Sequence, residues 1–132
     1  MQQLFGVQVG NPSTEMRVGT IAGFTFTPGN TDGVQEAAFS GPVALAQLGK
    51  DITILNSNDA VQDVSGWLAV VDHGNCSIRL VDHGSGAVCT LGGGTGFRDG
   101  DMKVARFRRP HDIVACAGGY LVVVDMGNHA IR

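Results

Sequence analysis

Apolar positions along the chain fall in short runs separated by clusters of Gly, Asp, Asn and Ser. Such runs, roughly four to eight residues long and rich in Val, Ile and Leu, are typical of β-strands, and no segment shows the periodicity of a helix. Residues 121–124 form a β-branched run too short for a helix, so we expect a strand buried on both faces. The pattern predicts strands over 42–47, 67–72, 76–82, 87–91, 110–115 and 121–124.

The sequence also repeats itself. VVVDMGNHAIR, residues 122–132, matches AVVDHGNCSIR, residues 69–79, at seven of eleven positions. Upstream, the A-x-F-x-x-P of residues 105–110 echoes that of residues 37–42, in the same order but at an offset of 68 instead of 53. The first copy therefore carries about fifteen extra residues within 48–66, which we expect to add a strand and a loop on the opposite face.

Each repeat unit places a D-x-G-N turn after its second strand. The Asp is expected to hold this turn by accepting hydrogen bonds from backbone N–H groups ahead of it, while Gly and Asn tolerate a positive φ. The recurring Arg79 and Arg132 are expected to reach a neighbouring unit or a turn carbonyl. The predicted structural turn residues are Asp72, Gly74, Asn75, Asp125, Gly127 and Asn128.

Four short antiparallel strands in tandem, at a period of about 40 to 50 residues, are typical of β-propeller blades. The motif D-x-G-N-x-x-I-R after an apolar strand, with its lead-in T-[IL]-[AG]-G, D-G and A-x-F-x-x-P, resembles the NHL repeat over roughly residues 18–132. The Leu of the Asn-His-Leu signature is replaced in both copies, and its His is kept only at His129. The resemblance implies an all-β fold of four-stranded propeller blades that serve as a binding platform.

This register divides the chain into three parts. Residues 1–23 would hold the last two strands of a partial blade (4–9 and 18–21), 24–93 a full blade with an insertion near 48–66, and 94–132 the start of the next blade. Two blades form an incomplete ring whose open edges expose strand backbone. We therefore expect a fragment of a longer chain, closed by other blades in cis, or further copies of the chain assembling into one ring.

Composition removes several classes of function. The 132 residues are 43% hydrophobic, enough for one domain's core, and the net charge of −3 gives no global field toward nucleic acid or membrane. The longest apolar run, 67–71, is too short for a bilayer span, and the N-terminus shows no signal-peptide pattern. Cys76, Cys89 and Cys116 match no metal-binding spacing. The localisation stays open, with a cytoplasmic location favoured over secretion.

The histidines give no obvious metal site. His73 and His83 both lie in Val-Asp-His-Gly, but in turns at opposite ends of strand 76–82, about 20 Å apart. His111 and His129 fall in other elements. We expect no bound metal and no cofactor.

Catalytic motifs are weak as well. Asp72 and Asp125 occur one per unit, too far apart to act as a carboxylate pair, and Cys76 has no visible base. The glycine run 92–96 lacks the Lys and the following helix of a phosphate-binding loop. We expect no catalytic residue.

Charge is unevenly spread along the chain. Residues 97–132 hold six basic and four acidic residues, against three and eight in residues 1–96. The basic loop 98–109, flanked by Phe97 and Phe107, is expected on the same face as the D-x-G-N turns, where phosphate contacts and base stacking would allow RNA binding. The candidate binding face comprises Arg98, Lys103, Arg106, Arg108, Arg109, His73 and His129.

The sequence therefore predicts a non-catalytic protein-interaction scaffold of NHL type, because rigid strands would hold variable loops on one face. RNA binding through the 98–109 loop is the alternative. A propeller enzyme of the lyase or lactonase-like kind is a further alternative. The expected partner is a protein, with RNA possible and no membrane contact.

Overall fold

The chain is an all-β protein built from several antiparallel sheets. The computed structural model describes residues 6–7, 18–23, 27–56 and 58–132. In this part of the chain the only helical segments are two short 3₁₀ turns, η1 (His73–Asn75) and η2 (Met126–Asn128). No helix among these residues has the length and apolar character needed to cross a membrane.

Residues 27–93, the first unit, form a four-stranded antiparallel meander in the order β3-β6-β7-β8. Its strands lie where the pattern of apolar residues predicts them, and the turn at 82–86 joins the last two. Their bounds are β3 (Pro42–Gln47), β6 (Leu68–Asp72), β7 (Ser77–Val81) and β8 (Val88–Gly93).

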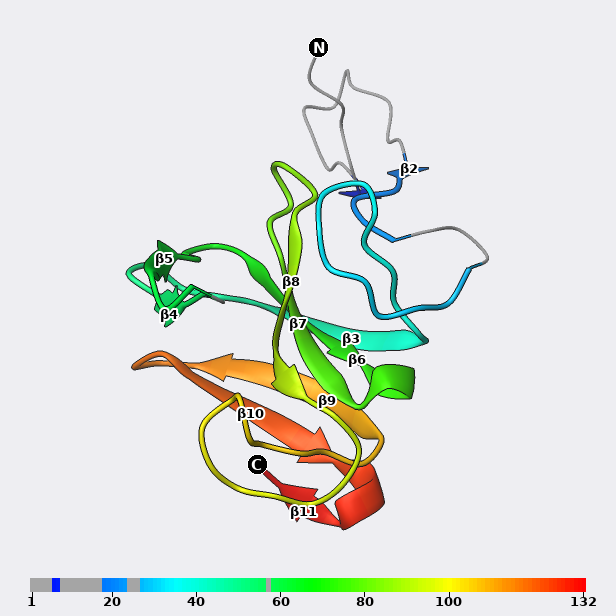
Figure 1. Cartoon of the computed structure of the whole chain (residues 1–132). Helices are drawn as coiled ribbons and strands as arrows, with labels where there is room; N and C mark the ends of the chain where they lie inside the picture. The colour runs from blue at the N-terminus through cyan, green and yellow to red at the C-terminus, as the bar shows by residue number, and fades with distance from the viewer. Residues whose placement is uncertain (1–5, 8–17, 24–26, 57) are drawn as a thin grey trace.

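Residues 94–132, the second unit, repeat the start of this arrangement. The strands β9 (Pro110–Cys116), β10 (Tyr120–Asp125) and β11 (Ala130–Ile131) form an antiparallel sheet in the order β11-β10-β9. Figure 1 shows this sheet, orange to red, lying below the green sheet of the first unit. The first strands of the two units, β3 and β9, lie next to each other.

The main core lies between the two sheets. Burial of each large aliphatic side chain contributes about 1.5–3 kcal/mol, so this shared core fixes the second unit against the first. Its buried members are Leu48, Val64, Ala69, Val71, Ile78, Leu80, Phe107, Ile113 and Val123. The described sheets do not close into a barrel or a ring.

The extra residues of the first unit form a separate hairpin of two strands, β4 (Thr53–Leu55) and β5 (Val61–Asp63), where one strand was expected. It lies at the end of the sheets away from η1 and η2, since Ile52 lies against Gly119 in the β9–β10 turn. Near the N-terminus, β1 (Gly6–Val7) pairs with β2 (Val18–Gly19). The other residues of the predicted 4–9 strand lie outside the described residues.

Repeat-equivalent residues of the two units differ sharply in burial. Val71 and Ile78 are 0% and 1% exposed because the second unit covers them, whereas their counterparts Val124 and Ile131 are 36% and 69% exposed. The expectation that residues 121–124 would be buried on both faces is therefore wrong. Only the face turned toward the first unit, which carries Val123, is covered.

Candidate functional site

The D-x-G-N turn of the first unit holds the loop 27–40 with which that unit begins. Asp72 accepts a hydrogen bond of 2.8 Å from the backbone N–H of Ser40 and one of 2.7 Å from the Asn75 side chain. Asn75 also donates to the carbonyl of Gly29 at 2.7 Å. The expected bonds from the backbone N–H groups of the turn to Asp72 are absent, and the bond within the turn comes from the Asn75 side chain instead. The Asp72 side chain fixes a loop some thirty residues upstream along the chain.

Arg79 completes this network from the neighbouring strand β7. Its guanidinium donates to Asp72 at 2.8 Å and to the carbonyls of Ala38 and Thr31 at 2.9 and 2.8 Å. It also forms an ion pair of 2.7 Å with Asp32 in the same upstream loop. Arg79 therefore binds loop carbonyls within its own unit, one of the two roles expected for it.

The second unit repeats the network residue by residue. Asp125 accepts from the N–H of Arg108 at 2.8 Å and from Asn128 at 2.7 Å. Arg132 donates to Asp125 at 2.8 Å and pairs with Asp99 at 2.7 Å, as Arg79 does with Asp32. The stacking is repeated as well, since Arg79 lies 4.9 Å from the ring centroid of Phe39 and Arg132 lies 5.3 Å from that of Phe107. Each unit thus fixes its own entering loop to its sheet.

The glycine of each turn is required by a close approach of backbone. Gly74 donates its N–H to the carbonyl of Ser40, and Gly127 donates its N–H to that of Arg108, both at 2.7 Å. A Cβ at either glycine would lie 2.5 Å from the same carbonyl oxygen. No larger residue fits there without moving the loop.

The loops and turns of both units meet along one edge of the structure, here called the loop edge. It consists of loop 27–40, the two flanks 94–98 and 105–109 of the second loop, and the turns η1 and η2, which the two networks join to the sheets. The basic residues predicted for this edge differ in their availability. Lys103 reaches the hairpin insertion at the other end of the sheets, where it is paired with Asp59 at 2.8 Å; the pairing lowers the pKa of Asp59 and raises that of Lys103. Arg106 donates to the carbonyls of Gly93 and Ala105 at 3.2 and 2.9 Å.

The remaining cations of the predicted face are exposed. Arg98, Arg108 and Arg109 have exposed side chains, and so does His129 in the turn after η2. The basic loop is therefore a smaller patch than its sequence suggested, because Arg106 is half-buried against carbonyls and the exposed Lys103 is paired with Asp59.

A contact that the sequence did not predict lies at the same edge, between the units. His73 in η1 and His111 in β9 have ring centroids 6.0 Å apart with an interplanar angle of 78°. His73 Nδ1 lies 2.9 Å from the carbonyl oxygen of Pro110. His111 lies where the β9–β10 pairing shifts register, between the pairs Asp125↔Pro110 and Val124↔Asp112, so strand alternation did not predict this contact.

Among the described residues, no group of three or more His, Cys, Asp or Glu side chains is placed to hold a metal ion. Cys76 is buried, and its sulfur lies 3.5 Å from the N–H of Arg109, so it has the environment of a structural thiol. His83 lies in the exposed 82–86 turn.

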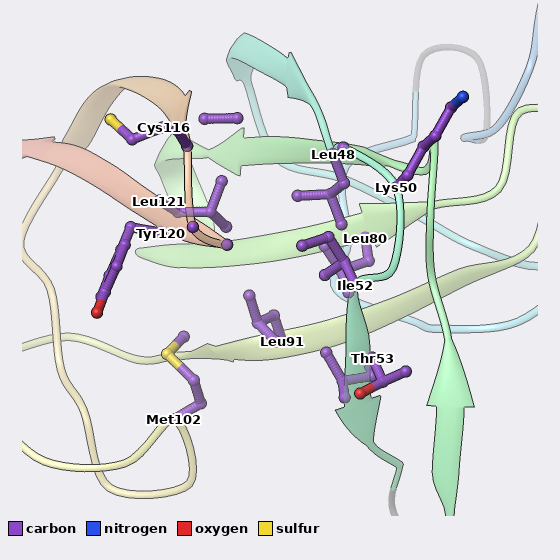
Figure 2. Close-up of a pocket in the computed structure, with 16 residues that line it drawn as sticks. Leu48, Lys50, Ile52, Thr53, Leu80, Leu91, Met102, Cys116, Tyr120 and Leu121 are labelled. Carbon is purple, nitrogen blue, oxygen red and sulfur yellow. The ribbon is translucent and has the colours of Figure 1, made fainter.

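An apolar cavity of about 420 Å³ lies between the units at the end opposite the loop edge. The hairpin insertion supplies one wall through Ile52 and Ile54. Figure 2 shows Leu80, Leu91, Met102 and Leu121 around the cavity, with the Lys50 amine and the Tyr120 hydroxyl turned away from its centre. This is within the roughly 300–1,000 Å³ typical of small-molecule sites, but its lining offers few polar groups for orientation.

Fold and geometry together define a class: an all-β protein of tandem antiparallel units whose loops are fixed along one edge. No protein-family model and no curated protein matches the chain. Two crystal structures share its fold. An auxiliary nutrient binding protein from Bacteroides thetaiotaomicron VPI-5482 has 25% identity and a TM-score of 0.70, over 87% of this chain and 28% of that one. An auxiliary nutrient binding protein from Bacteroides ovatus ATCC 8483 has 21% identity and a TM-score of 0.73, over 95% of this chain and 30% of that one.

The chain therefore spans less than a third of the length of either of these proteins. Their likeness is a likeness of fold, extending over most of this chain.

Proposed function

We propose that the chain is a segment of an NHL-type β-propeller and serves as a non-catalytic protein-interaction scaffold, with the loop edge as its binding face. The observation that carries the proposal is the repeated network of Asp, Asn and Arg. In each unit it attaches the entering loop to the sheet by charged hydrogen bonds that are buried or partly buried. Loops fixed in this way can bind a partner with little loss of conformational entropy.

Three features support the propeller part of the proposal. The four-stranded meander with its first strand beside the first strand of the next unit is the arrangement of successive blades. The second unit exposes Val124 and Ile131 on the face by which the first unit packs against its successor. The two structural neighbours are more than three times as long as this chain.

A photo-crosslinking residue tests the binding face. It would replace Arg108 at the loop edge or, as the matched control, Ser85 in the exposed turn at the opposite end of β7. We expect a saturable protein adduct from position 108 that excess unmodified chain competes away, and none from position 85. Equal labelling from both positions, or none from position 108, would contradict the scaffold proposal.

RNA binding through the 98–109 loop is the second candidate, favoured by the exposed Arg98, Arg108 and Arg109. Three phosphate contacts would make binding salt-dependent with a slope of about −2, since single strands give about −0.7 per phosphate. Filter binding of single-stranded RNA should show this slope, and replacing the three arginines with Ser should remove it. Weak binding that is independent of salt would exclude the loop as an RNA site.

The description of the structural neighbours as nutrient binding proteins adds a small-molecule candidate for the apolar cavity. A thermal-shift screen of apolar metabolites would test it, with Leu91→Trp as the variant in which the cavity is filled. Stabilisation of the chain but not of the variant would favour this candidate over the scaffold. The enzyme alternative has no supporting group of residues among those described.

A further inference from the structure

We propose that His73 and His111 form a two-histidine site for a first-row transition-metal ion at the junction of the two units. The residues are far apart in sequence, and the fold brings their rings to 6.0 Å between centroids. An ion in line with a ring nitrogen lies about 3 Å from the ring centroid, because Zn–N bonds are roughly 2.0–2.1 Å long. Two rings on one tetrahedral ion have centroids about 5 Å apart, so binding requires the exposed His111 ring to approach His73 by about 1 Å.

The hydrogen bond of His73 prepares it for this role. A carbonyl oxygen can only accept, so the Nδ1 that lies 2.9 Å from Pro110 O carries the proton and donates it. The other nitrogen, Nε2, is then unprotonated in the neutral ring and available as a ligand. Metal-binding histidines are usually oriented in this way, with one ring N–H donated to a carbonyl or carboxylate.

The fold itself does not require histidine at either position. The repeat places Met126 where the first unit has His73, and Val43 where the second unit has His111. Met126 follows Asp125 as His73 follows Asp72, and Val43 follows Pro42 as His111 follows Pro110. The histidine pair is therefore a property of this one junction between units.

The surroundings set the kind of site. His111 is exposed and His73 is half-buried, so an ion can enter from solvent and water can fill its remaining positions. In the sequence, His111 is flanked by the charges of Arg109 and Asp112, which are opposite in sign. Imidazole ligands suit Zn²⁺, Cu²⁺ and Ni²⁺, and we take Zn²⁺ as the probe.

The test measures Zn²⁺ binding to the 132-residue chain by competition with a chromophoric chelator. All proteins carry Cys116→Ser, so that this exposed thiol does not bind the metal. We expect one ion per chain, and at least a tenfold loss of affinity in His73→Ala and in His111→Ala, because even outer-shell partners change affinity by about 10–100-fold. His83→Ala, in an exposed turn, is the matched control and should bind as the parent does.

Nitrogen-15 NMR of the imidazoles gives a second readout that is independent of affinity. Zinc should shift the Nε2 resonance of His73 and a ring nitrogen of His111 together, while His83 and His129 stay unchanged. Should His73→Ala unfold the chain, His111→Ala alone decides the question, since its side chain is exposed. Equal zinc affinity of parent and His111→Ala, or shifts at His83 instead, would overturn the proposal.

Discussion

The guanidinium of Arg79 donates a 2.8 Å hydrogen bond to the carboxylate of Asp72, and the two side chains are 1% and 0% exposed. The same bond, also of 2.8 Å, joins Arg132 to Asp125 in the second unit. A buried ion pair is weak evidence for net stability, because desolvation offsets much of the attraction. Its main consequence here is specificity, since it fixes where each entering loop attaches.

Removing one charge of this pair should destabilise the protein strongly. Asp72→Asn removes the buried counter-ion of Arg79 and leaves only the half-exposed Asp32, for which we expect a loss of about 3 kcal/mol in the free energy of unfolding. Urea unfolding followed by circular dichroism measures the change. Asp63→Asn is the control, because its carboxylate is exposed and accepts its hydrogen bonds from the nearby Ser65. A loss no larger than that of the control would show that the pair does not hold the loop.

The close approach at Gly74 gives a second test of the same attachment. Gly74→Ala puts a Cβ at 2.5 Å from the Ser40 carbonyl, so the loop must move, and overpacking of this kind costs about 1–3 kcal/mol. Gly49→Ala is the matched control, since a Cβ there meets nothing within 4 Å. We expect a lower unfolding midpoint for the first variant only. Equal midpoints would mean that the contact yields without cost.

The strands and the repeat could be predicted from the sequence, because short apolar runs and turn residues act locally. For that reason the predicted bounds of strand 42–47 agree with those of β3 in the structure. The partners of Asp72 were not predictable, since a carboxylate next to a turn can bond to the turn or to any loop that folds over it. The His73–His111 contact was missed because it forms across two units, where sequence spacing gives no distance.

Because the two units differ in burial, the same substitution at equivalent positions should change the stability of the protein by very different amounts. Ile78→Asp places a charge in the core between the sheets and should unfold the chain, whereas Ile131→Asp lies on an exposed face and should change the unfolding free energy by less than about 0.5 kcal/mol. Thermal unfolding of both variants measures this. If a second copy of the chain covers this face in solution, Ile131→Asp will instead lower the midpoint in a concentration-dependent way.

The cysteines should differ in their reaction with iodoacetamide. Burial raises the pKa of the Cys89 thiol, and the charge of Asp32 adds to the increase, only partly offset by Arg79. Because the thiolate is the reactive form, Cys89 should react at a higher pH than the exposed Cys116. Mass spectrometry of each site from pH 7 to 10 gives the two profiles. A reaction of Cys89 at lower pH than Cys116 would contradict the structure around it.

One side of the second unit is unfilled. A cavity of about 410 Å³ lies there, lined in part by Leu91, Phe107 and Val123. In the first unit the corresponding space holds Val81 and Val88, which pack with Val70 and Ile21. Since Ile131-Arg132 corresponds to Ile78-Arg79, a copy of residues 80–93 attached after Arg132 should continue β11 and fill the cavity.

We expect this extension to raise both the midpoint and the m value of urea unfolding, because burying two valines contributes about 3 kcal/mol before the entropy of ordering the added strands is subtracted. The matched control carries the same extension with Val81→Asp and Val88→Asp in the copied segment, which keeps its length but cannot fill the cavity. If both extensions leave m unchanged, the second unit does not accept the outer strands of a blade, and the proposal of tandem propeller blades fails at its central assumption.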